Sequence, residues 1–114
     1  MGADMSKYNS KKITYNGETF DSKKEYRRFC ELSLLERAGA ITDLQRQVRF
    51  ELIPSQKENG KVVERPCTYI ADFVYFDMQT CRRTVEDTKG VKTKDYIIKR
   101  KLMLWVHGIK IKEV

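Results

Sequence analysis

Asp72, Asp87 and Lys89 combine residue types and a spacing that could do chemistry in this sequence of 114 residues. Asp72 interrupts the otherwise apolar residues 69–76, where a buried carboxylate is costly unless it is paired or bound to a cation. Asp87 and Lys89 are two residues apart, and side chains at that spacing share one face of a strand. Two carboxylates and an ammonium that converge on one point could bind a hard divalent cation through oxygen ligands.

Each of these residues also has an ordinary structural interpretation. An isolated Asp in a strand is commonly hydrogen-bonded for structural reasons, and an Asp-x-Lys pair is commonly an exposed salt bridge. Glu25 lies three residues after Ser22, so its side chain could simply complete a helix capping box. The order of the three acids, on one predicted helix and then on two successive predicted strands, favours a shared site.

Turn residues and helical periodicity predict the first elements that position these side chains. Asn-Gly at residues 16–17, between two short β-type triplets, predicts an N-terminal hairpin. Apolar residues at helical spacing predict helices over residues 23–38 and 94–107, and each is followed by a glycine that can end it. We expect Tyr96 and Trp105 of the second helix to lie in the core.

Period-two alternation and turn residues predict the strands. They are expected over residues 48–53, 68–76, 84–89 and 109–112. The element order indicates an α/β (α+β) fold with a mixed sheet. Residues 1–10 are predicted to be a disordered polar arm, and residues 11–114 a single domain.

The charge balance points to a polyanionic partner. Lys and Arg number 23 and Asp and Glu 16, so the formal net charge is +7, which favours nucleic acid ahead of an anionic membrane surface. We expect no secretory signal and no membrane-spanning helix, because no apolar stretch approaches roughly 20 residues. Three cysteines without a CxxC pair predict a reducing, cytoplasmic setting, and nothing in the sequence indicates an organic cofactor.

A longer string of residues resembles a known family. It comprises Tyr-Asn-Gly at 15–17, Phe-Asp-Ser-Lys at 20–23, Glu25, Gly-Ala-Ile-Thr-Asp-Leu at 39–44, Gln47, Tyr-Ile-Ala-Asp-Phe at 69–73, Val-Glu-Asp-Thr-Lys-Gly at 85–90 and Thr-Lys at 93–94. In this string and its order, the chain resembles the PD-(D/E)XK nuclease superfamily, and within it a group of small, phage-encoded, Holliday-junction-resolvase-like endonucleases. The resemblance implies a restriction-endonuclease-like core of order α-β-β-β-α-β, with a central mixed sheet flanked by two helices.

The resemblance also assigns roles within the site. By position, Asp72 matches the first acid of the motif, Asp87 the second acid and Lys89 the lysine. Glu25 matches an acid that some members place on the first helix, and it is either a metal ligand or only a helix cap. The main-chain carbonyl of Thr88 would be a further ligand. One or two Mg²⁺ or Mn²⁺ ions would then serve as cofactor for hydrolysis of a DNA phosphodiester, leaving 5′-phosphate and 3′-hydroxyl ends.

Two departures from the motif bear on this assignment. Ala71 stands where the superfamily name has proline. Glu86 lies next to Asp87 and could be mistaken for the second acid, but strand alternation would turn Glu86 away from Lys89. Asp87 is therefore the preferred acid.

The basic residues near the motif are predicted to contact DNA phosphates. They lie on the first helix, just after the motif and on the second helix: Lys23, Lys24, Arg27, Lys92, Lys94, Lys99 and Lys101. By analogy with the family, the substrate would be branched or junction DNA and the cutting unit a homodimer, acting in the cytoplasm of the bacterium that the phage infects. Whether it would cut one strand or both is left open. The alternatives are a non-catalytic basic nucleic-acid-binding module that keeps the fold, and a basic protein that binds an acidic protein partner.

Overall fold

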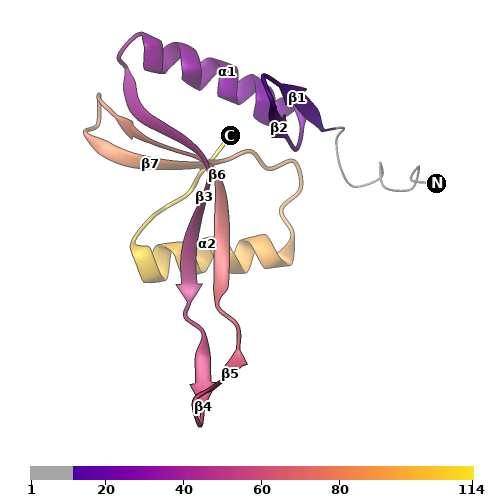
Figure 1. The fold of residues 1–114 in the computed structure, drawn as a ribbon. Coiled ribbons are helices and arrows are strands. Elements are labelled where there is room, and N and C mark those ends of the chain that lie inside the picture. The colour runs from indigo at the N-terminus through magenta and orange to yellow at the C-terminus, as the bar shows by residue number, and fades with distance from the viewer. Residues whose placement is uncertain (1–11) are drawn as a thin grey trace, which may run out of the picture.

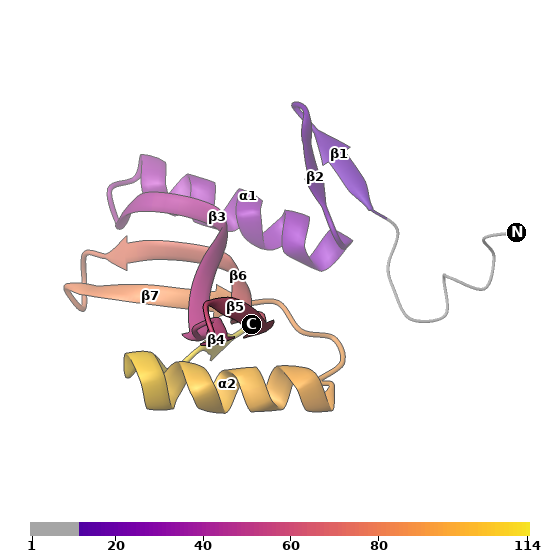
Figure 2. The same cartoon turned by 60° about the horizontal axis from the view of Figure 1, so that its bottom comes forward.

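The computed structural model describes residues 12–114 and shows a mixed α+β fold in three layers. Helix α1 (Lys23–Arg37) covers one face of a four-stranded sheet, and helix α2 (Lys94–His107) covers the other face (Figures 1 and 2). The predicted α+β class with a mixed sheet and two helices is confirmed. The arm predicted for residues 1–10 lies outside the described residues.

The central sheet has the strand order β3-β6-β7-β8. The three long strands pair antiparallel, and β8 pairs parallel to β7. Their bounds are Ile41–Ile53 for β3, Cys67–Asp77 for β6, Arg82–Asp87 for β7 and Lys112–Glu113 for β8. The prediction for β6 is confirmed to within one residue at each end.

The other three strands differ from their predicted bounds. β3 begins at Ile41 rather than at Val48, because a bulge between Thr42 and Gln45 breaks the alternation that would reveal its first half. β7 ends at Asp87, so Lys89 lies beyond the strand. β8 pairs only from Lys112, and the alternating residues before it connect α2 to the sheet.

Two Asn-Gly turns form hairpins outside the central sheet. The predicted N-terminal hairpin is confirmed as β1 (Ile13–Tyr15) and β2 (Glu18–Phe20). A second ribbon, β4 (Gln56–Glu58) and β5 (Lys61–Glu64), extends away from the three layers (Figure 1). All four turn residues have φ between 51° and 80°, as the turns of such two-residue hairpins require.

Each face of the sheet has its own apolar cluster. The cluster against α2, called the α2 core here, comprises Phe50, Leu52, Tyr69, Ala71, Val74, Val85, Tyr96, Met103 and Ile111. The α1 core comprises Leu32, Ile41, Phe73 and Tyr75. Between residues 12 and 114, no helix has the length and apolar character needed to cross a membrane.

The central strand β6 changes its alternation at Asp72. Four residues at odd positions, which strict alternation would put on one face, divide between the two cores: Tyr69 and Ala71 pack in the α2 core, Phe73 and Tyr75 in the α1 core. On β3, Gln47 stands between the residues paired with Phe73 and Ala71, and its φ is 54°. This irregularity puts Asp72 where the two cores meet.

Trp105 does not lie in the core, so that prediction is wrong. Its side chain is 85% exposed, whereas Tyr96 and Met103, seven residues apart, are buried. Because α2 has apolar residues on several sides, the sequence does not decide which side of the helix faces the sheet. In the structure, the side that contains Tyr96 and Met103 faces the sheet.

Candidate active site

Asp72 of β6 and Asp87 of β7 lie next to each other across the two strands. The β6–β7 pairing includes Phe73 opposite Glu86, so Asp72 and Asp87 follow as the next pair. Asp72 Oδ2 accepts hydrogen bonds from the Thr88 main-chain N–H at 2.8 Å and from the Thr88 hydroxyl at 2.7 Å. These two bonds fasten the chain just after β7 to the point where β6 changes its alternation.

Asp87 is a buried carboxylate with one satisfied oxygen. Its side chain is almost fully buried, and the Tyr69 hydroxyl donates a hydrogen bond to Oδ2. Oδ1 has no hydrogen-bond partner within the part of the chain that the structure describes. Burial, and after it the negative charge of Asp72, raises the pKa of Asp87 to about 7.

Lys89 faces the oxygen of Asp87 that lacks a hydrogen bond. Its Nζ lies 3.7 Å from Asp87 Oδ1 and 4.7 Å from the centre of the Tyr96 ring. Because β7 ends at Asp87, strand alternation does not hold Lys89 in this position. The ion pair with Asp87 and the contact with the aromatic face of Tyr96 hold it instead.

Glu25, at the start of α1, lies near enough to Asp72 for the two charges to interact. Ser22 Oγ accepts a hydrogen bond from the Glu25 N–H at 3.1 Å, which begins the helix. The Glu25 carboxylate accepts from the Asp21 N–H at 2.8 Å and from the Gln47 side-chain amide at 2.9 Å. Burial raises the pKa of Glu25, and the charge of Asp72 raises it further. Glu25 is therefore both a cap and an electrostatic neighbour of the site.

Glu86 has its own partners on the opposite face of the sheet. Arg28 of α1 donates two hydrogen bonds to it, from Nε at 2.8 Å and from a terminal nitrogen at 2.7 Å, and the Tyr75 hydroxyl donates a third. Lys112 Nζ lies 3.9 Å away. Glu86 is thus a satisfied structural carboxylate on the face of the sheet opposite Asp87, as strand alternation predicts for two neighbouring residues.

A pocket of about 310 Å³ opens beside Lys89 and the N-terminus of α2. Its lining includes two lysines and one acid, Lys89, Lys99 and Asp95, together with the hydroxyl-bearing Thr68 and Thr93 and with Tyr69, whose hydroxyl binds Asp87. The pocket therefore joins two ammonium groups to the candidate site.

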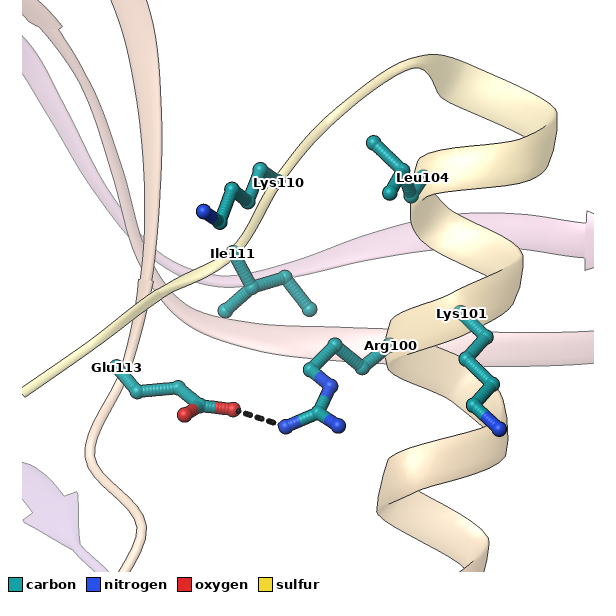
Figure 3. Close-up of a pocket in the computed structure, with 6 residues that line it drawn as sticks. All are labelled: Arg100, Lys101, Leu104, Lys110, Ile111 and Glu113. Atoms are coloured by element: carbon teal, nitrogen blue, oxygen red, sulfur yellow. Dashed lines mark hydrogen bonds and ion pairs between the residues drawn. The ribbon is translucent and has the colours of Figure 1, made fainter.

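The structure separates Lys101 from Lys99. Lys101 lines a different groove, of about 220 Å³, between α2 and the segment that leads to β8 (Figure 3). Because 200° of helical rotation separates the two lysines at about 100° per residue, they project from different sides of α2.

The remaining predicted phosphate ligands lie at the surface around the site. Lys23, Lys24 and Arg27 are exposed on the first turns of α1, and Lys24 Nζ lies 3.5 Å from the main-chain carbonyl of Lys89. Lys92 forms an ion pair of 3.0 Å with Glu113, and Lys94 is exposed at the start of α2.

A hard divalent cation fits the paired aspartates on two observations. Asp87 Oδ1 is buried and lacks a hydrogen bond, and a cation would give this oxygen a partner. The charge of Asp72 raises the pKa of Asp87, and a cation between the two carboxylates would offset that repulsion. Over residues 12–114, no three acidic, histidine or cysteine side chains already form a metal-binding group. The residues that could complete a ligand set are the main-chain carbonyl of Thr88 and the carboxylate of Glu25.

Sequence reasoning missed the groups that hold the acids in place. Tyr69, Tyr75 and Arg28 each donate a hydrogen bond to Glu86 or Asp87. Two tyrosines on the same strand as Asp72 could have indicated such hydrogen bonds, because a buried tyrosine hydroxyl usually has a polar partner.

The chain matches a family model described as "Protein of unknown function (DUF1064)" over residues 5–112. Comparisons with curated proteins and with solved structures find no match.

Proposed function

The chain belongs to the DUF1064 family of proteins of unknown function, and we propose that it is a divalent-metal-dependent DNA endonuclease. One observation supports this above all others. Two adjacent strands bring the carboxylates of Asp72 and Asp87 together, and Lys89 Nζ lies 3.7 Å from the Asp87 oxygen that lacks a hydrogen bond. This is the donor set and the ammonium expected for metal-assisted phosphodiester hydrolysis.

The order of elements supports the same proposal. With the β1–β2 and β4–β5 hairpins set aside, the elements of the three layers come in the order α-β-β-β-α-β: α1, β3, β6, β7, α2 and β8. This is the core order of the PD-(D/E)XK nucleases that the sequence resembles. The two acids then stand on the second and third strands of that core, and Lys89 follows directly. We therefore propose the restriction-endonuclease-like version of this α+β fold.

The chain's own residues would divide the work as follows. Asp72 and Asp87 hold the cation through carboxylate oxygens, with the Thr88 carbonyl and Glu25 as further ligands. Bound there, Mg²⁺ or Mn²⁺ supplies a water of lowered pKa and offsets negative charge on the phosphate. Lys89 orients the attacking water or stabilises charge as it develops on the phosphate oxygens.

The pocket beside Lys89 would receive the phosphate backbone. Lys99 supplies a second ammonium there, and the Thr93 N-cap puts the N-terminus of α2 at the same wall. Ammonium groups and helix N-termini both favour an anion. Lys23, Lys24 and Arg27 extend the positive surface along α1.

The substrate, assembly and location remain predictions of the resemblance. We propose branched or junction DNA as the substrate and a homodimer as the cutting unit, acting in the cytoplasm of a phage-infected host. Nicking of one strand is the alternative outcome of the same chemistry.

Cleavage assays test the proposal directly. Labelled four-way junction, duplex and single-stranded DNA are incubated with the wild-type protein in Mg²⁺, Mn²⁺ or EDTA. We expect cleavage with either metal and none in EDTA. Asp87→Asn keeps an acceptor for Tyr69 but removes the charge, so it should lower the rate by about 100-fold or more, as should Lys89→Met.

Matched variants separate the site from general charge effects. Asp77→Asn removes an acid from the same strand as Asp72, and Lys61→Met removes a lysine from the β4–β5 ribbon. Both should keep wild-type rates. Cleavage of no substrate by the wild type would overturn the enzymatic proposal in favour of a non-catalytic binding module. Cleavage that Asp87→Asn leaves unchanged would overturn the site.

A further inference from the structure

The outward face of α2 is an exposed ridge of alternating cationic and apolar side chains. Lys94, Ile98, Lys101 and Trp105 follow one another at intervals of four, three and four residues, which aligns them along one side of a helix. All four are exposed, and Trp105 is exposed over 85% of its surface. A tryptophan this exposed contributes nothing to the core and is available to a ligand.

A groove borders this ridge and shares Lys101 with it. Leu104 of α2 and Ile111 give it apolar walls, and its volume is about 220 Å³ (Figure 3). Arg100 is joined to Glu113 across the groove at 3.0 Å. Lys101 and Lys110 extend from its two sides. The surface therefore offers flat apolar area with ammonium groups beside it.

The charge of α2 favours a polyanion over a second copy of this chain. The helix contains Lys94, Lys99, Arg100 and Lys101 against the single acid Asp95. A second copy carries the same excess of positive charge on this helix, so pairing through the ridge would bring two cationic helices together, which is destabilising. An exposed aromatic side chain among lysines is the pattern that binds the bases and phosphates of an unpaired strand.

We propose that the ridge of α2 binds a single-stranded segment of the DNA substrate, with a base stacked on Trp105 and phosphates at Lys101 and Lys110. This rests on the proposed function and deepens it, because it names the substrate as DNA with unpaired bases near the cut. Trp105 lies eleven residues along α2 from Lys94, or about 16 Å along the helix axis.

The single tryptophan of the sequence makes the contact directly observable. The wild-type protein in EDTA is titrated with a single-stranded oligonucleotide, with a blunt duplex of equal length and with inorganic polyphosphate. We expect strong quenching of Trp105 fluorescence by the single strand, and weak or no quenching by the duplex and by polyphosphate.

Affinities measured with labelled oligonucleotides complete the test. Trp105→Ala should weaken single-strand binding by about 5- to 100-fold and change duplex binding less than about twofold, because stacking on one aromatic ring is lost. Trp105→Phe should recover much of the loss. Leu34→Ala, at an exposed apolar residue of α1, is the matched control and should change neither affinity.

The outcomes separate this proposal from the nuclease proposal. Quenching by single strands from a protein that cleaves nothing would support the ridge and overturn the nuclease alone. Cleavage of duplex and junction DNA by a protein whose Trp105 fluorescence is not quenched by a single strand would overturn the proposal for the ridge and leave the nuclease proposal in place. Loss of a dimer in sedimentation of Trp105→Ala, with single-strand affinity unchanged, would assign the ridge to self-association and overturn the proposal.

Discussion

Glu86 and Asp87 are adjacent in the sequence, yet their carboxylates lie on opposite faces of the sheet, each bound by a tyrosine of β6. Tyr75 donates to Glu86, which two nitrogens of Arg28 also hold. Tyr69 donates to Asp87, whose second oxygen lacks a hydrogen bond among residues 12–114. Two consecutive acids therefore have different roles, one holding α1 to the sheet and the other facing Lys89.

The raised pKa of Asp87 predicts that the metal-free protein loses stability as pH rises. Its pKa is about 7 in the folded chain against an ordinary value of 3.8, so the folded state binds the extra proton between these values. Stability should fall by about 2 kcal/mol from pH 5 to pH 7 and level off above that. Urea denaturation in EDTA measures this. Asp87→Asn should remove most of the slope, and a slope unchanged in that variant would contradict the prediction.

Added Mg²⁺ should stabilise the wild-type protein more at pH 8 than at pH 5.5, because Asp87 must lose its proton to bind a cation. At a Mg²⁺ concentration tenfold above Kd the gain is about 1.4 kcal/mol, or a rise in Tm of about 5 °C. Thermal denaturation of wild type, Asp72→Asn and Asp77→Asn tests the site. The gain should vanish in Asp72→Asn and persist in Asp77→Asn, and an equal gain in both would count against it.

Removal of Tyr69 or Tyr75 should have different effects although both are buried tyrosines on one strand. The Tyr69 hydroxyl lowers the pKa of Asp87, so Tyr69→Phe should move the pH at which Mg²⁺ stabilises the protein, and at which cleavage rises, to higher values. Tyr75→Phe should lower stability by about 1 kcal/mol and leave the pH profile in place. The measurement is a pH series for both variants, and identical profiles would refute the distinction.

Arg28 and Arg27 offer a matched pair for the opposite face of the sheet. Arg28→Met leaves the buried Glu86 without its bidentate partner and should destabilise the protein by about 3–5 kcal/mol. Arg27 is exposed on the same turn, so Arg27→Met should cost about 0.5 kcal/mol or less. Urea denaturation compares the two, and equal losses would show that Glu86 does not depend on Arg28.

DNA affinity should depend steeply on salt. If about five phosphates are contacted, log K should fall with log salt concentration at a slope near −4 to −5, and each contacting lysine removed should reduce the slope by about 1. Lys99→Ala should show that reduction, and Lys61→Ala on the β4–β5 ribbon should not. Fluorescence anisotropy at several salt concentrations gives the slopes, and a wild-type slope near zero would favour a protein partner over DNA.

Local signals predict much of this fold because they act over a few residues. The Asn-Gly dipeptide at residues 16–17 predicts the N-terminal hairpin, and Ser22 and Thr93 begin the helices as their types suggest. The register of α2 was not predictable, because apolar residues surround the helix and only the packed sheet selects Tyr96 and Met103. The first half of β3 was hidden for a similar reason, since a bulge removes its alternation.

The candidate site was predictable as a set of residues but not as a geometry. The order of Glu25, Asp72, Asp87 and Lys89 in the chain is visible in the sequence. The positive φ of Gln47 and the change of alternation at Asp72 depend on pairing between distant strands, which no local pattern records. The change of alternation at Asp72 also puts Tyr69 on the face of Asp87 and Tyr75 on the face of Glu86.

The change of alternation at Asp72 also affects how the protein opens. β6 contributes side chains to both cores, and Asp72 binds the segment after β7. Neither helix layer can therefore separate from the sheet without disturbing the strand that supports the other. Amide hydrogen exchange should show β6 as the slowest-exchanging strand, with α1 and α2 opening in one cooperative step rather than as separate units.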